Sequence, residues 1–201
     1  MRIAFFSWEA THAVAVGGVG VHVSALAAAL ARQGHAVHVF TRLGAGQRLH
    51  DDVFGVRYHR CPVEPRKSFV EEMAGMAAAL AHYVPEEQAA TGRFDLLHVH
   101  DWLPAPAGLA LKAESAGRLA TTFHTTEWGR TGAWPDKGES LRIAEIERAL
   151  VRESDVLIAA SHEVRRQLDA LYQCSDWKTS IVHHGVDLAR FDLEPFDIGA
   201  A

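Results

Sequence analysis

The segment from Thr121 to Arg130 carries more chemically active side chains than a structural turn requires. Within it, His124, Glu127 and Arg130 bring an imidazole, a carboxylate and a guanidinium into seven consecutive positions. A turn that only reverses the chain uses Gly, Asn or Pro instead. The three groups suit general acid or base catalysis and the binding of an anion. The alternative is a loop that hydrogen-bonds to itself. We favour function for His124, and for Glu127 and Arg130 both interpretations stay open.

Short apolar runs alternate with helical stripes along the chain, and these elements must position the segment. Runs typical of strands lie at residues 3–6, 36–41, 56–60, 94–100, 119–123, 156–159 and 178–182. Between them, apolar residues recur at helical spacing, as at Val23, Leu26, Ala27 and Leu30, and Ser161 is a suitable N-cap. The alternation predicts an α/β fold, a doubly wound and mostly parallel Rossmann-like sheet with helices on both faces.

In such a sheet, ligands bind beyond the carboxyl ends of the strands. Four polar or glycine-rich segments are expected there. They are the loop ending in Gly17-Gly18-Val19-Gly20, His100-Asp101-Trp102, the Thr121–Arg130 segment, and His183-His184-Gly185-Val186-Asp187. They come from separate parts of the chain, and the topology gathers them on one edge. This convergence predicts a binding or catalytic site.

The glycine segment only partly resembles a dinucleotide fingerprint. Its third glycine is replaced by Val23, and Thr41-Arg42 stands where an acidic residue would bind the ribose of NAD. No Gly-Lys-Ser/Thr follows, so it is not a Walker loop either. Two interpretations stay open: an anion held at a helix N-terminus, or a tight turn before a helix.

A metal site is the alternative for His98, His100 and Asp101, because two imidazoles and a carboxylate can bind zinc. No HExxH or CxxC pattern supports it. We prefer a hydrogen-bonded or substrate-contacting role and expect no metal. A Ser-His-Asp hydrolase is disfavoured because no Gly-x-Ser-x-Gly segment occurs.

Composition narrows the class of protein. The chain has 201 residues and a formal charge of -5, which gives no general attraction to nucleic acid. No stretch reaches the roughly 18 apolar residues of a membrane span, and the N-terminus lacks the layout of a signal peptide. Cys61 and Cys174 share no motif. We therefore expect a reduced, cytoplasmic protein.

The ordered motifs resemble the N-terminal half of GT-B retaining glycosyltransferases, glycosyltransferase family 4, of the glycogen-synthase-like type. The matching pieces are Gly17-Gly18-Val19-Gly20-Val21-His22-Val23, residues 34–41, His98-Val99-His100-Asp101-Trp102, residues 122–130, Ala160-Ser161, and residues 182–187 with Phe191. Each piece alone is weak, and the ordered set is specific.

The resemblance implies an enzyme that moves a sugar from a nucleotide-sugar, a substrate and not a cofactor, to a hydroxyl acceptor with retention of configuration. Glucose added to a glucan is the first choice. The Gly17-Gly18 loop would approach the donor diphosphate, and His124 would lie beside the transferred sugar. Asp101, Glu127 and Arg130 would shape the acceptor side, and Gly185 and Asp187 would belong to the hinge. The resemblance implies no metal.

The same resemblance implies a domain division. Residues 1–190 would be the acceptor-binding domain and 191–201 the start of an interdomain hinge, with the chain's own donor-binding C-terminal domain absent and the fragment inactive alone. Two departures stand out: Ala15 replaces the lysine of starch and bacterial glycogen synthases, and His183-His184 replaces the usual Pro-Asn. The alternatives are a nicotinamide- or flavin-binding domain and a non-catalytic carbohydrate-binding module.

Overall fold

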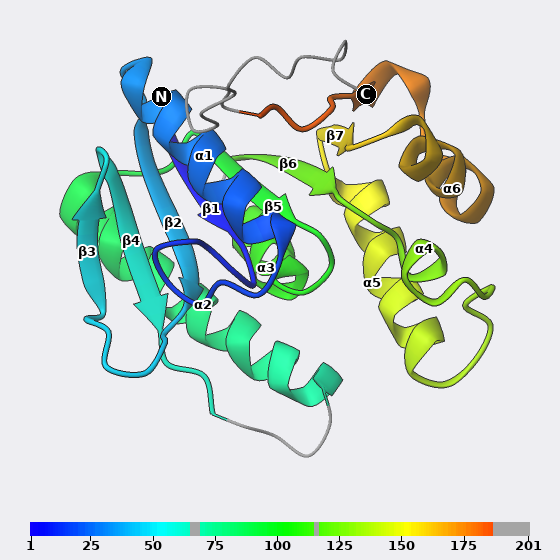
Figure 1. The fold of residues 1–201 in the computed structure, drawn as a ribbon, viewed down its shortest axis with the longest axis horizontal. Coiled ribbons are helices and arrows are strands. Elements are labelled where there is room, and N and C mark those ends of the chain that lie inside the picture. Colours follow the sequence, from blue (N-terminus) through cyan, green and yellow to red (C-terminus); the bar gives the residue numbers. More distant parts are fainter. Residues whose placement is uncertain (65–68, 115–116, 187–201) are drawn as a thin grey trace, which may run out of the picture.

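Figure 1 shows the computed structural model of the chain, which describes residues 1–64, 69–114 and 117–186. The sheet has eight strands in the order β3-β4-β2-β1-β5-β6-β7-β8. Their bounds are β1 (Arg2–Phe6), β2 (Ala36–Arg42), β3 (His50–Val53), β4 (Val56–Cys61), β5 (Leu96–His100), β6 (Arg118–Phe123), β7 (Val156–Ala159) and β8 (Thr179–Ile181). All pairings are parallel except that of β3 with β4. The α/β, doubly wound prediction is confirmed, and the expected strands are present with ends shifted by two residues at most.

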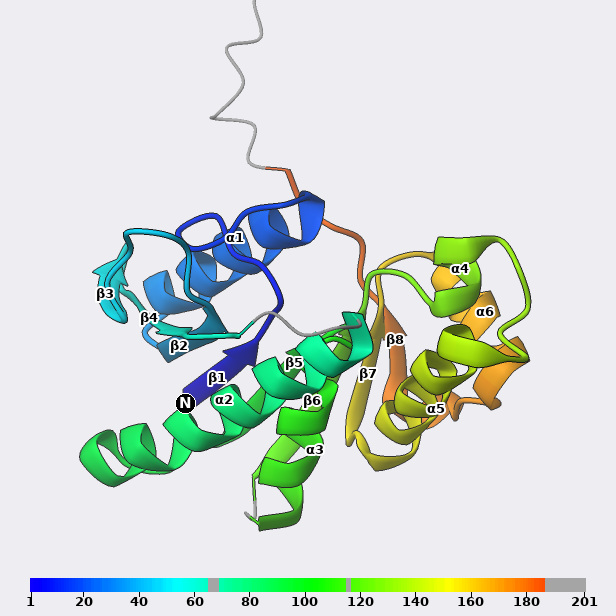
Figure 2. The ribbon, with the colours of Figure 1, turned by 90° about the horizontal axis from the view of Figure 1, so that it is seen from below.

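Helices cover both faces of the sheet. They are α1 (Gly18–Arg32), α2 (Phe69–Thr91), α3 (Ala105–Glu114), α4 (Glu127–Thr131), α5 (Gly138–Glu153) and α6 (His162–Tyr172), with a short 3-10 turn at Asp176–Lys178. Figure 2 shows α1 on one side of the central strands and α2 and α3 on the other. Among the residues that the structure describes, none of the helices combines the length and apolar character needed to cross a membrane.

The two faces have separate cores because side chains alternate along a strand. On β1, Ile3 and Phe5 belong to the cluster that α1 covers, together with residues of β2 and β4. Ala4 and Phe6 belong to the larger cluster that contains the apolar faces of α2, α3 and α5. The central strands are therefore buried on both faces, which leaves their carboxyl ends as the accessible edge.

Two elements differ from the sequence expectation. The loop expected between the second and third predicted strands contains β3, which pairs with β4 through a hairpin whose central residues Phe54 and Gly55 have φ of 52° and 78°. Positive φ at both central positions is typical of a type I′ turn. The Thr121–Arg130 segment also runs into α4, which begins after the N-cap Thr126 and ends at Thr131, with Gly132 as its C-cap. The predicted N-cap of α6, Ser161, is confirmed, since its Oγ accepts the N–H of Val164 at 3.1 Å.

Candidate functional site

Backbone hydrogen bonds continue past the ends of the strands and fix the loops at the carboxyl edge. Asp101 N–H donates to Thr122 O at 2.9 Å, and Ala160 N–H donates to Phe123 O at 3.0 Å. Beyond β8, Val182 N–H donates to the carbonyl oxygen of Ala159, the last residue of β7, at 3.0 Å. The sequence segments expected to converge are thus in register along one edge, and their side chains meet there.

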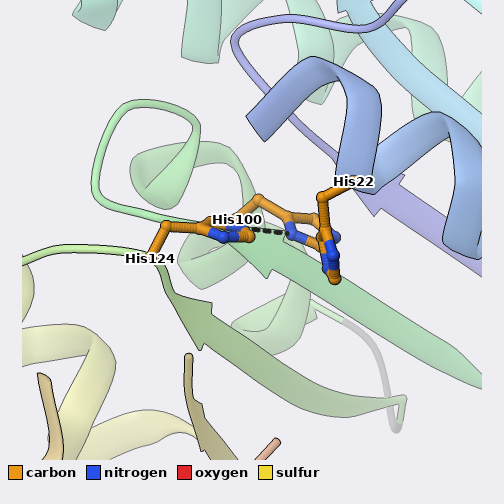
Figure 3. Close-up of side chains that lie close together, drawn as sticks. All are labelled: His22, His100 and His124. Atoms are coloured by element: carbon orange, nitrogen blue, oxygen red, sulfur yellow. Dashed lines mark hydrogen bonds between the residues drawn. The ribbon is translucent and has the colours of Figure 1, made fainter. Parts of the chain in front are cut away.

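Three histidines from different elements form the centre of this edge, and we call them the three-histidine cluster. They are His22 of α1, His100 at the end of β5, and His124 directly after β6 (Figure 3). The His22 and His124 ring centroids lie 5.0 Å apart, and those of His22 and His100 lie 5.9 Å apart. His184 stacks on His22 at 4.2 Å. The cluster joins the helix that follows the glycine segment to the ends of two adjacent strands.

A line of imidazole nitrogens runs through the cluster. His100 Nδ1 and His124 Nε2 lie 3.1 Å apart, and His124 Nδ1 and His184 Nε2 lie 2.9 Å apart. A neutral imidazole has one N–H and one lone pair, so the protons of all three rings must point along the line in the same direction. His100 Nε2 is buried and has no hydrogen-bond partner. The line therefore ends on a nitrogen that the described residues leave unsatisfied.

The rings of the cluster are neutral at pH 7. Burial, and the neighbouring His184, lower the pKa of His22 to about 4. Burial, and then His22 and His184, lower the pKa of His124 to about 3, and burial holds that of His100 well below its usual value. Desolvation disfavours the imidazolium form, and close imidazoles disfavour a second charge. His124 is therefore suited to hydrogen bonding with a substrate and not to donating a proton as a cation.

Asp101 positions His124 through its main chain. The Asp101 carboxylate accepts the N–H of His124 at 2.7 Å and also hydrogen-bonds the backbone of Thr125. Burial raises its pKa to about 7. Asp101 has φ of 60°, a left-handed conformation that Asp and Asn adopt more readily than most residues. The predicted site residues Asp101 and His124 are thus brought into direct contact.

The glycine segment adjoins the cluster through α1, because Gly18 and His22 are four residues apart on one helix face. The Glu9 carboxylate accepts the N–H groups of Val16 and Gly17, both at 2.6 Å. An anionic oxygen thus already occupies the predicted phosphate-facing position at Gly17. Gly18 is exposed, and a Cβ there would meet no atom within 4 Å. The donor-diphosphate role of Gly17 and Gly18 stays a prediction. At Gly17, a diphosphate would have to displace the Glu9 carboxylate from the backbone N–H.

Glu127 and Arg130 lie on α4 and bind each other. Arg130 Nε and Nη2 donate to the two Glu127 oxygens at 2.7 and 2.6 Å, and Ser140 Oγ donates to Oε1 at 2.6 Å. The side chain of Glu127 is 0% exposed, whereas that of Arg130 is 54% exposed. Hydrogen bonding to Glu127 raises the pKa of Arg130. The Glu127 carboxylate binds Arg130 of α4 and Ser140 of α5 and so holds the two helices together. Only the Arg130 guanidinium has N–H groups that face solvent. Their acceptor-side roles stay predictions.

The remaining predicted residues are Gly185 and Asp187, which are expected to belong to the hinge. Gly185 is exposed, and Asp187 lies outside the described residues, so the hinge roles stay predictions. Sequence reasoning did not name His22, His184 or Glu9 as site residues. A partial signal existed for His22, which follows Gly18 at helical spacing. The contacts of His184 and Glu9 depend on segments that are distant in the sequence.

Two groups of side chains in the described part of the chain have the geometry to hold a metal ion. They are the three-histidine cluster and a buried group made of His38, His59 and Glu87, and in each group one ligand atom per residue lies within 4.8 Å of the others.

The doubly wound sheet, with its polar residues gathered beyond the carboxyl edge, shares the fold of a domain in a solved sucrose-phosphate synthase. The sequence of the chain matches the profile of Glycosyltransferase Family 4 over residues 16–190, and the chain belongs to that family.

Individual relatives agree with this assignment. A glycogen synthase of Mycobacterium tuberculosis is 32% identical over 206 residues, which cover 95% of this chain and 50% of that protein. A D-inositol 3-phosphate glycosyltransferase of Streptomyces scabiei is 32% identical over 183 residues, covering 87% and 41%. Among solved structures, a sucrose-phosphate synthase from Thermosynechococcus elongatus superimposes with a TM-score of 0.76 at 22% identity, covering 94% of this chain and 49% of that one. The chain spans about half the length of the curated relatives it matches.

Proposed function

We propose that this chain is the N-terminal, acceptor-binding half of a cytosolic retaining glycosyltransferase. The enzyme would move a sugar, with glucose as first choice, from a nucleotide-sugar to a hydroxyl acceptor such as a glucan. The donor would be held between this chain and a second domain, so the chain alone would not turn over. The family membership and the meeting of His124 with α1 at the carboxyl edge carry this proposal.

Two similarities support the donor and the acceptor. The glycogen synthase relative is 32% identical to this chain. A solved structure of Anabaena HepE in complex with UDP-glucose has a TM-score of 0.63 to this chain at 14% identity. The second similarity shows a shared fold, and the choice of glucose rests mainly on the first.

His124 would contact the transferred sugar through a neutral ring. With a pKa of about 3, its imidazole carries no charge at neutral pH and suits a sugar hydroxyl, which both donates and accepts hydrogen bonds. Asp101 holds the main chain of His124 and His100 holds its Nε2, so a sugar hydroxyl would replace the exposed His184 at His124 Nδ1. Such preorganisation favours stabilisation of the transition state over tight binding of the ground state.

The experiment compares two forms of the protein. Transfer from UDP-glucose or ADP-glucose to maltohexaose is measured with the isolated 201-residue chain and with a protein that joins it to its donor-binding half. We expect turnover only in the joined protein. There, His124→Ala should lower kcat by roughly 100-fold or more while changing the acceptor KM little.

Arg152→Ala is a matched control, because Arg152 is exposed and pairs with Glu153 away from the cluster. It should leave both constants unchanged. Steady transfer by the isolated chain would refute the need for a second domain. Near-normal kcat in His124→Ala would remove His124 from the reacting centre.

A further inference from the structure

Four imidazoles meet at the edge that carries the proposed sugar site, which is more than hydrogen bonding to one sugar requires. The His100 ring is buried, and its Nε2 has no hydrogen-bond partner. The other nitrogen of this ring, Nδ1, faces His124 Nε2 at 3.1 Å. Figure 3 shows the rings of His22, His100 and His124 turned toward one another from three separate elements.

We propose that His22, His100 and His124 bind a transition-metal cation such as Zn²⁺, with the fourth coordination position open to solvent. Three histidines with an open fourth position are an established ligand set for zinc. Two nitrogens bound to one tetrahedral zinc lie roughly 3.3 Å apart at the usual Zn–N length. His100 Nδ1 and His124 Nε2 are 3.1 Å apart, and one nitrogen of each ring lies within 4.8 Å of the others. Small rotations of the rings therefore suffice.

The surroundings of the cluster favour a cation. A ligating imidazole usually donates its second N–H to a neighbouring acceptor, and His124 Nδ1 faces His184 Nε2 at 2.9 Å. Asp101 adds a carboxyl group beside His124, and Glu9 lies near enough to influence Asp101 electrostatically. The rings are also neutral, so their lone pairs are available to a metal.

The second group of potential ligands is less suited to a cation. Arg57 Nε lies 3.8 Å from the Glu87 carboxylate, and Arg2 Nη2 lies 3.5 Å from His38 Nε2. Two guanidinium groups at this range oppose a divalent ion. This group serves as an internal control.

Metal at the cluster would also regulate the enzyme, a consequence that rests on the proposed function. A cation bound to His124 takes up the ring that would face the transferred sugar. Zinc would therefore inhibit transfer, and inhibition would be reversed by a chelator.

The test measures binding and turnover separately. The metal-free chain is titrated with Zn²⁺ by calorimetry, and its Co²⁺ complex is examined for the intense visible bands of tetrahedral cobalt. We expect one site per chain. Loss of a second-layer partner typically weakens metal binding 10- to 100-fold, so His22→Gln, which removes a ligand, should weaken it by about 100-fold or more. Circular dichroism establishes that the variant is folded.

Two control variants identify the site. His82→Gln removes an exposed histidine beside Glu86, and Glu87→Gln removes a ligand of the second group. Both should bind Zn²⁺ as the unmodified chain does. Absence of saturable binding, or binding that survives His22→Gln and disappears in Glu87→Gln, would overturn the proposal. Zinc inhibition is then measured with the joined protein as a fraction of each variant's own zinc-free rate, and His22→Gln should keep a larger fraction of its rate than the unmodified protein does. Transfer without zinc binding would refute only the metal site, and zinc binding without transfer would refute only the proposed activity.

Discussion

Replacing Asp101 tests how the site is built, because one carboxyl group holds the main chain at His124. In Asp101→Ala, the N–H groups of His124 and Thr125 lose their acceptor. A buried donor without a partner costs about 1–3 kcal/mol. Thr125 is exposed, so water replaces part of its loss. Alanine also fits the left-handed φ of 60° less well than Asp, by up to about 1–2 kcal/mol. We expect a total loss of about 3 kcal/mol in the free energy of unfolding.

Asp101→Asn should behave differently. Asparagine retains a carbonyl oxygen at the same place and tolerates the same φ. At pH 6 the pKa of about 7 keeps Asp101 mostly protonated, so the neutral amide is a close mimic. We expect a change below about 1 kcal/mol. For a chain of this size, the loss in Asp101→Ala corresponds to a fall in Tm of about 6–12 °C.

The assay is urea unfolding at pH 6, followed by far-ultraviolet circular dichroism. Asp101→Gly separates the two causes, because glycine accepts the positive φ without strain and provides no acceptor. If the hydrogen bonds dominate, the Gly variant should lose most of what the Ala variant loses. Equal stability of the Ala and Asn variants would refute the acceptor role. A Gly variant as stable as Asn would assign the loss to backbone strain.

Three further predictions concern stability. Six histidines with lowered pKa, His22, His38, His59, His98, His100 and His124, bind protons on unfolding below pH 6.5, and the raised pKa values of Asp101 and Glu147 offset about two of these protons. The free energy of unfolding should therefore fall by up to about 5 kcal/mol per pH unit from pH 6.5 toward 4.5, and equal urea midpoints at pH 6.5 and 5 would contradict this. Gly108→Ala should cost about 1–3 kcal/mol because its Cβ would lie 2.3 Å from Val99 Cγ2, and Val99→Ala in the same chain should recover part of the loss. Ser161→Ala should cost about 1 kcal/mol through loss of the N-cap, with Ser161→Asp as the control that keeps it, and thermal unfolding checks both pairs.

The sequence alone determined the sheet, its helices and the edge where function gathers. Strands buried on both faces appear as apolar runs, and amphipathic helices repeat every 3.6 residues, so both signals are local. The rule that ligands bind beyond the carboxyl ends places Asp101 and His124 together from the sequence alone. The family resemblance followed from the same ordered motifs, and the profile over residues 16–190 agrees with it.

Only the tertiary structure decided the elements and contacts that depend on partners. Strand β3 is short, polar and mostly exposed, so its identity comes from pairing with β4 and not from its own pattern. Glu127 was a candidate for contact with the acceptor, yet folding buries its carboxylate and pairs it with the half-exposed Arg130. His22, His124 and His184 meet only because helix packing and strand order bring distant segments together. Local sequence fixes which groups are available, whereas long-range packing fixes which of them touch.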